Sequence, residues 1–116
     1  MVARDEYVPR RGDIVWIDLI PQAGHEQSGR RPAVILSPET YNGKVGLALF
    51  CPLTSQVKGY PWEVRIPEGL SVSGVVLADQ VKNLDWRSHR AEFLCALPES
   101  AVAEILDKVG TIVRDS

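Results

Sequence analysis

The sequence predicts a mainly antiparallel β fold, a small and partly open barrel of short strands, with one C-terminal helix. Three observations support this fold class. Short apolar runs alternate with polar residues at a two-residue period, which is typical of half-buried strands. The 8 prolines and 9 glycines place turns between these runs. Near the C-terminus the period changes to that of an amphipathic helix.

The strands follow from these runs in order. In the first one, apolar residues stand at positions 15, 17 and 19, and Pro21 ends the alternation. The longest apolar run predicts a strand that is buried on both faces. We expect strands at residues 13–20, 33–37, 45–53, 62–66 and 74–78, and a last short one at 91–97. We expect a lead-in arm at residues 1–12 and turns or loops at 38–43, 58–61, 67–73 and 85–90.

Residues 98–113 predict the helix. Apolar side chains recur there at i, i+3, i+4 and i+7, which places them on one helical face. They are Val102, Ile105, Leu106, Val109, Ile112 and Val113. Pro98 and Glu99 suit the first turn, and Lys108 and Arg114 suit the C-terminal half. Such a helix must bury its apolar face on the barrel or on a partner.

The composition limits the possible classes of protein. With 116 residues, a single domain over residues 1–116 is expected. The net charge of −2 offers no broad basic field, so binding of a nucleic acid would need a local patch. The N-terminus has no apolar signal region, and no apolar run approaches the length of a membrane span. We therefore expect a cytoplasmic protein without membrane contact.

Cysteine and histidine are too sparse for a metal site. Cys51 and Cys95 each lie in an apolar run, which suits buried free thiols. The two histidines, His25 and His89, stand singly, so no metal-ligand spacing exists and no cofactor is expected. His89 is interpreted as an exposed residue without a specific role.

The loop at residues 24–32 concentrates polar chemistry between two predicted strands. It carries an imidazole, a carboxylate, an amide, a hydroxyl and two guanidinium groups: His25, Glu26, Gln27, Ser28, Arg30 and Arg31. A loop of about ten residues is long for a plain hairpin connection. Polar composition is also the default for any loop, so composition alone only makes this segment a candidate site.

A second polar group, Thr54, Ser55 and Gln56, ends the third predicted strand. Strand ends converge in a small barrel, so we expect Arg31 and Thr54 to face one pocket. With His25 or Glu26 as proton acceptor, this set suits attack by a ribose 2′-OH on the neighbouring phosphate. The nucleophile then belongs to the substrate, and no nucleophile from the protein is needed.

Residues 79–90 hold aromatic and basic side chains that suit phosphate contacts and base stacking. They are Asp79, Gln80, Lys82, Trp86, Arg87 and Arg90. The alternative is a solvated surface segment with one tryptophan in the core. Trp16 shares a strand face with Asp18 beside the polar loop, and this favours a contact surface. Trp62 in its alternating strand is interpreted as a core residue.

Several motifs in order resemble one family. Gly12-Asp13 precedes a strand with a tryptophan; Gly24-His25-Glu26-Gln27, Gly29 and Arg31-Pro32 follow; then come Pro52-Leu53-Thr54-Ser55 and Asp79-Gln80. This order over essentially the whole chain resembles the MazF/PemK (Kid) toxins. Tyr41-Asn42, Lys58-Gly59-Tyr60-Pro61 and Trp86-Arg87 are similar to the MazF branch.

The resemblance implies an SH3-like barrel of the CcdB/MazF/Kid type and a homodimer. It implies a toxin of a type II toxin–antitoxin system, countered by a MazE-like antitoxin. The implied activity is a sequence-specific, metal-independent endoribonuclease on single-stranded RNA or mRNA. The implied products carry 2′,3′-cyclic phosphate and 5′-hydroxyl ends, and the cleavage stops translation and growth.

Roles carried over by position centre on Arg31, Thr54 and Glu26. Arg31 would stabilise charge or transfer a proton, Thr54 would contact the scissile phosphate, and Glu26 would be the general base. His25 ranks second for the base, as in the Kid-like branch. Asp79 ranks third, because Leu77 stands where that branch has an arginine. Expected RNA contacts are Trp16, Asp18, Gln27, Ser55, Gln80, Lys82 and Arg87.

Two other functions stay open at this point. A non-enzymatic barrel toxin of the CcdB kind would poison a protein target on a similar fold, and fold alone does not separate the two. An RNA-binding module without turnover is the third interpretation. Arg31 together with Thr54 distinguishes the nuclease from the protein poison, which does not need that pair.

Overall fold

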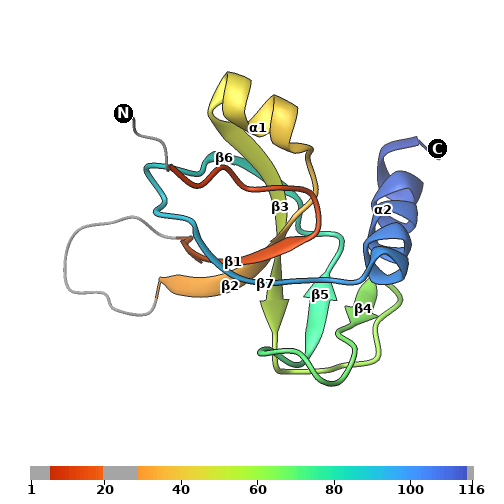
Figure 1. Ribbon diagram of the computed structural model, residues 1–116. Helices are drawn as coiled ribbons and strands as arrows, with labels where there is room; N and C mark the ends of the chain where they lie inside the picture. The colour runs from red at the N-terminus through yellow and green to blue at the C-terminus, as the bar shows by residue number, and fades with distance from the viewer. Residues whose placement is uncertain (1–5, 20–28, 115–116) are drawn as a thin grey trace.

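A computed structural model of the chain describes residues 6–19 and 29–114 (Figure 1). The strands are β1 (Asp13–Asp18), β2 (Arg30–Ile35), β3 (Leu47–Thr54), β4 (Glu63–Arg65), β5 (Val75–Leu77), β6 (Lys82–Asp85) and β7 (Glu92–Ala96). The helices are α1 (Glu39–Val45) and α2 (Glu99–Arg114). All six expected strands are present, with ends shifted by at most three residues, and the predicted C-terminal helix is confirmed.

The strands form one strongly bent antiparallel sheet in the order β4-β5-β3-β2-β1-β7 (Figure 1). β6 pairs with the first half of β3, whereas β5 pairs with its last two residues. β3 is therefore the central strand, and its two ends belong to different surroundings. The path of strands is open, because β4 and β7 stand at its ends. The predicted class, a mainly β fold with a C-terminal helix, is confirmed.

Two apolar clusters cover the two faces of the sheet. On one face Ile14, Val34 and Val76 pack with Val102 and Ile105 of α2. The other face buries a second set: Val15, Ile17, Ala33, Ile35, Ala48, Phe50 and Trp86. Both faces of β1 and β2 are covered in this way, which explains why buried apolar residues stand at consecutive positions in these strands.

The amphipathic helix α2 buries only part of its apolar face. Val102 and Ile105 are buried, and Val109 packs against the core. Leu106, Ile112 and Val113 lie on the outer part and remain exposed. Neither helix of the described residues combines the length and hydropathy that a membrane crossing requires.

Residues 38–43 were expected to form a turn, and this expectation was wrong. They begin α1, with Pro38 as its N-cap and Gly46, at φ +83°, as its C-cap. The Asn42-Gly43 pair signals a turn in many sequences. Here the Asn42 side chain is fully buried instead, and its Nδ2 donates to the carbonyls of Pro9 (2.8 Å) and Ser37 (3.0 Å).

β6 was not predicted, because Lys82–Asp85 is polar and mostly exposed and shows no clear apolar alternation. Its strand structure comes from backbone pairing with Leu47–Phe50 of β3. The lead-in segment is also more than an arm. The Gly12 amide donates to the Ile35 carbonyl at 2.8 Å, and the Tyr7 hydroxyl donates to the buried Asp13 carboxylate at 2.5 Å.

Candidate active site

Arg31 and Thr54 line one cavity, as the sequence predicted. β2 and β3 pair with Ala33 opposite Pro52, and extending this antiparallel register by two residues sets Arg31 opposite Thr54. The cavity holds about 520 Å³, and its lining residues are Arg31, Pro32, Leu53, Thr54, Ser55, Gln56, Val72 and Ser73. It therefore offers a guanidinium and a hydroxyl group to one bound molecule.

The loop before β5 forms the far wall of this cavity through Val72 and Ser73, which sequence reasoning did not select. Gly74 makes the approach possible. It has φ +110°, and a Cβ atom placed on it would lie 2.2 Å from the Thr54 carbonyl oxygen. No other residue fits there without moving Thr54. This glycine, the first residue of a predicted strand, was the available signal.

A second cavity of about 390 Å³ adjoins the first on the other side of Thr54. Its lining residues are Thr54, Gln56, Lys58, Tyr60, Glu63, Leu77 and Gln80. Thr54 and Gln56 line both cavities. The backbone amide of Gln56 donates to Thr54 Oγ1 at 3.1 Å. That bond orients the hydroxyl oxygen and leaves its proton to be donated to a ligand.

Asp79 lies on the turn after β5, next to Gln80 and the second cavity. Its carboxylate accepts a hydrogen bond from the Tyr60 hydroxyl, and this bond raises the pKa of Tyr60. Asp79 is not among the residues that line the cavity with Arg31. The structure therefore brings Gln80 beside Thr54 and gives Asp79 a partner on the loop between β3 and β4.

Leu19 and Gly29, the described residues on either side of the 20–28 segment, are held close together. The Leu19 amide donates to the Gly29 carbonyl at 2.8 Å. The Asp18 carboxylate accepts hydrogen bonds from Arg90 at 2.8 Å and from Arg30 at 3.0 Å. Both bonds lower the pKa of Asp18, and the bond from Arg90 has the larger effect. Predicted residues His25, Glu26 and Gln27 lie outside the described residues.

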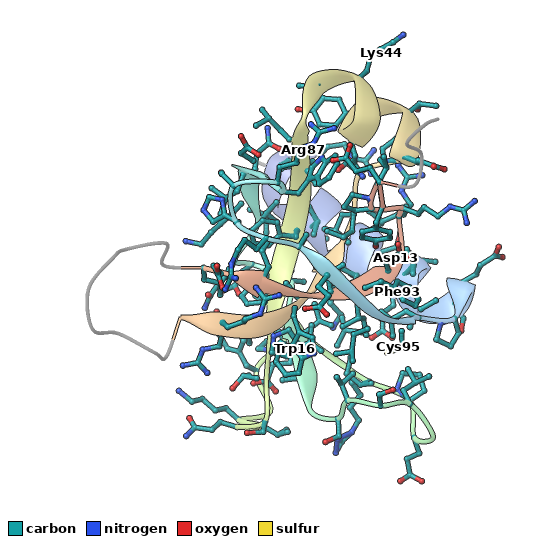
Figure 2. All side chains as sticks on the ribbon, turned by 60° about the vertical axis from the view of Figure 1, so that its left-hand side comes forward. Asp13, Trp16, Lys44, Arg87, Phe93 and Cys95 are labelled. Carbon is teal, nitrogen blue, oxygen red and sulfur yellow. The ribbon has the colours of Figure 1, made fainter. Side chains whose placement is uncertain are left out.

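Trp16 and Asp18, both predicted to contact RNA, therefore have different surroundings. Trp16 of β1 pairs with Pro32 of β2 and is 36% exposed. In Figure 2 its side chain lies below β2. Asp18 is committed to two arginines. Trp16 remains available as a contact surface, and Asp18 supports the base of the polar loop.

Lys82 and Arg87 lie farther from Thr54. Lys82 pairs with Phe50 of β3. Phe50 precedes Thr54 by four residues on this strand, which corresponds to about 13 Å along the strand. Arg87 lies near α1 (Figure 2) and donates to the Glu6 carboxylate at 2.6 and 3.2 Å. Its guanidinium carbon lies 4.5 Å from the centre of the Trp86 ring. Within one copy of the folded chain, Arg87 therefore lies apart from Arg31 and Thr54.

Of the two interpretations for Trp86, the core one holds. Trp86 is only 3% exposed, and its indole N–H donates to the Asn42 carbonyl at 2.9 Å. Trp62 is half-buried against the core. His89 is half-buried and not exposed as expected, with Nδ1 2.9 Å from the Asp85 carbonyl oxygen. Burial raises the pKa of the Cys51 thiol to about 12, and Cys95 is half-buried.

Comparison with known proteins gives one family. Residues 10–113 match the family described as PemK-like, MazF-like toxin of type II toxin–antitoxin system. The endoribonuclease toxin MazF of Escherichia coli K12 is 53% identical over 91 residues, covering 78% of this chain and 79% of that protein. The endoribonuclease toxin ChpB of the same organism is 34% identical over 120 residues, covering 98% and 100%.

Solved structures agree. MazE–MazF (Form-II) from Deinococcus radiodurans has a TM-score of 0.88 and 55% identity, covering 96% of this chain and 100% of that chain. MazF (Form-I) from the same organism has a TM-score of 0.85 and 56% identity, covering 93% and 98%.

Proposed function

This chain belongs to the PemK-like, MazF-like toxins of type II toxin–antitoxin systems, and we propose that it cleaves RNA at the cavity that Arg31 and Thr54 share. It is an endoribonuclease toxin, its substrate is RNA, and its partner is a MazE-like antitoxin. We place this activity in one domain of residues 1–116 and in the cytoplasm. The observation that carries the site is the meeting of Arg31 and Thr54.

The reaction proceeds by transfer of the phosphate within the substrate. The ribose 2′-oxygen attacks the adjacent phosphorus and loses its proton to a base of the protein. The bond between phosphorus and the 5′-oxygen breaks, and that oxygen takes up a proton. One product end carries a 2′,3′-cyclic phosphate and the other a 5′-hydroxyl. Because the substrate supplies the nucleophile and the protein supplies the base and the cation, the proposed step uses no metal ion.

Arg31 and Thr54 suit the charge that develops on the phosphate. A guanidinium donates from a planar fork that matches phosphate oxygens, and it stays charged at every relevant pH. The Thr54 hydroxyl adds a neutral donor, already oriented by the Gln56 amide. Donors fixed before the reaction stabilise the extra negative charge of the transition state.

The base is Glu26 or His25 on the 20–28 segment, and the pH profile separates the two. If His25 is the base, the rate rises through a pKa in the neutral range as the imidazole loses its proton. His25→Ser then removes this rise and keeps part of the activity. An unchanged profile in His25→Ser assigns the proton transfer to Glu26, and Glu26→Gln is the matched variant.

The exposed apolar residues of α2 support a homodimer. Leu106 and Val109 border an apolar groove of about 490 Å³, with Leu36, Leu49 and Val81 on the side of the sheet. A second copy of the chain on this groove would bury the part of the helical face that the barrel leaves open. Sedimentation of the protein with Leu106→Glu, against the native protein, tests this assignment through the molecular mass.

The proposed reaction is tested with a long single-stranded RNA in the presence of EDTA. Cleavage into fragments with 5′-hydroxyl ends is expected, and it disappears when the scissile ribose is 2′-deoxy. Cleavage that survives the 2′-deoxy substitution contradicts the mechanism. The protein-poison alternative is not favoured, because the relatives are endoribonucleases.

A further inference from the structure

Residues 55–61, here called the wall loop, form the outer wall of the second cavity beside Thr54. Gln56, Lys58 and Tyr60 of this loop line the cavity and are exposed. The wall loop contains no helix or strand. A cavity wall of this kind keeps its shape only where other parts of the fold hold it.

Contacts near the loop hold part of it. The Glu63 carboxylate, at the start of β4, accepts from the Lys58 and Gly59 amides, at 3.0 Å each. The Tyr60 hydroxyl donates to Asp79 on the neighbouring turn. These bonds shape the turn and tie its middle to the end of β5. The Glu63 amide also donates to the Tyr60 carbonyl at 3.1 Å. These bonds do not involve Pro61, which forms the exit of the loop.

That exit is held by α2. The Lys108 ammonium donates to the Pro61 carbonyl at 2.5 Å. The Trp62 indole N–H donates to the helix at the Lys108 carbonyl (3.3 Å) and at Thr111 Oγ1 (3.2 Å). The Trp62 ring also makes an edge contact with the Tyr60 ring, with 6.3 Å between centroids. Helix, tryptophan and loop form a continuous chain of contacts that ends at the cavity.

We infer that α2 positions the wall loop for RNA, with Trp62 and Lys108 as positioning residues. This inference rests on the proposed function. Neither side chain lines the cavity, so both act through Lys58 and Tyr60. A loop that is ordered before RNA arrives loses less conformational entropy on binding, and this raises affinity. The contacts lie away from Arg31, so they govern binding of the substrate and not the chemical step.

Trp62→Phe is the sharpest variant, because it keeps an aromatic ring against Tyr60 and removes the indole N–H together with the second ring of the indole. We expect KM for RNA to rise about three- to tenfold, as one lost hydrogen bond predicts. The kcat should stay within about twofold, since Arg31 and Thr54 are untouched. Lys108→Met should act in the same direction, and Lys44→Met, on the exposed side of α1 (Figure 2), is its matched control.

A double-mutant cycle tests whether the contact itself matters. Thr111→Val removes one acceptor of the indole N–H on the helix. If Trp62 acts through α2, the double variant Trp62→Phe/Thr111→Val has the KM of Trp62→Phe alone. If the KM increases of the two single variants multiply in the double variant, the inference is overturned, because the two residues then act independently.

Hydrogen exchange gives a measurement that does not depend on activity. The Lys58 and Gly59 amides should exchange faster in Trp62→Phe and in Lys108→Met than in the native protein, while amides of β1 stay unchanged. Unchanged exchange at these two amides overturns the inference, and so does a KM equal to that of the native protein. If the native protein leaves RNA intact, the proposed function fails on its own control, before any variant is compared.

Discussion

The two ends of β3 present polar residues under opposite conditions. At its start, Ser37, Asn42 and Leu49 form a buried network in which Ser37 Oγ donates to Asn42 Oδ1 (2.5 Å) and accepts from the Leu49 amide (2.8 Å). At its end, Arg31 and Thr54 face a cavity. Buried polar groups whose bonds are all internal hold a fold together. Polar groups that face open space can bind a ligand.

The comparison predicts a separation of activity from stability. Variants at the cavity end should lose activity and keep stability, and variants at the network end should do the reverse. The following predictions run from the largest expected effect to the smallest.

Arg31→Ala should lower kcat for RNA cleavage by about 10²- to 10³-fold, because a charged donor to the transition state is lost. The exposed Arg31 side chain contributes little to packing, so the melting temperature should stay within a few degrees. A continuous assay with a fluorogenic RNA measures the rate. Arg10→Ala, on an exposed arginine paired with Glu39 near α1, is the control and should cleave normally.

Asn42→Ala should lower the free energy of unfolding by about 3 kcal/mol, since it leaves the buried Pro9 and Ser37 carbonyls without donors. Urea denaturation measures this, and the folded fraction should keep its kcat. Asn83→Ala is the matched variant, because Asn83 is exposed and its amide donates to the Tyr41 hydroxyl. A cost at Asn83 as large as that at Asn42 would contradict the comparison.

Thr54→Val should lower kcat by about tenfold, because one neutral donor to the phosphate is lost while the shape of the side chain is kept. Thr54→Ser should recover most of the rate, since it restores the hydroxyl that the Gln56 amide orients. The rates of all three proteins at saturating RNA decide the matter. Equal rates for the valine and serine variants would remove Thr54 from the mechanism.

Asp18→Asn tests the ion pairs at the base of the polar loop. The pKa of Asp18 is lowered in the folded protein by Arg90 and Arg30. Its contribution is therefore present above the unfolded pKa of about 3.9 and is lost as pH falls through the lower folded value. The native protein and Asp18→Asn should differ by less than about 1 kcal/mol at pH 7 and should converge near pH 2. Urea titrations at both pH values measure the difference.

Short-range signals predicted most of the fold. Alternation at residues 15, 17 and 19 located β1, although Ile14 on its other face is buried as well. The helical spacing located α2 to within a residue or two, because burial on one face imposes that period. Such periods fail where pairing or a buried polar network decides the structure. β6 has no clear apolar alternation, and Asn42 carries the mark of a turn while its amide serves the core.

The candidate site divides in the same way. The sequence predicted that Arg31 and Thr54 face one pocket, because strand ends and their loops converge in a small barrel, and the two residues do line one cavity. It did not separate Arg87 from them, because spacing along the chain does not show which end of β3 a later segment contacts. Glu6 and Trp86 hold Arg87 near α1, through a contact between residues 81 positions apart.

The sequence by itself determined the class of fold, the period of each long element and the chemical groups of the site, because these depend on local patterns of side chains. Only the tertiary structure decided which polar groups meet. It placed Val72, Ser73 and Lys58 around Thr54, and it committed Asp18 to two arginines. It also joined α2 to the wall loop through Trp62. Contacts between distant segments depend on how the whole chain packs, and no local pattern records them.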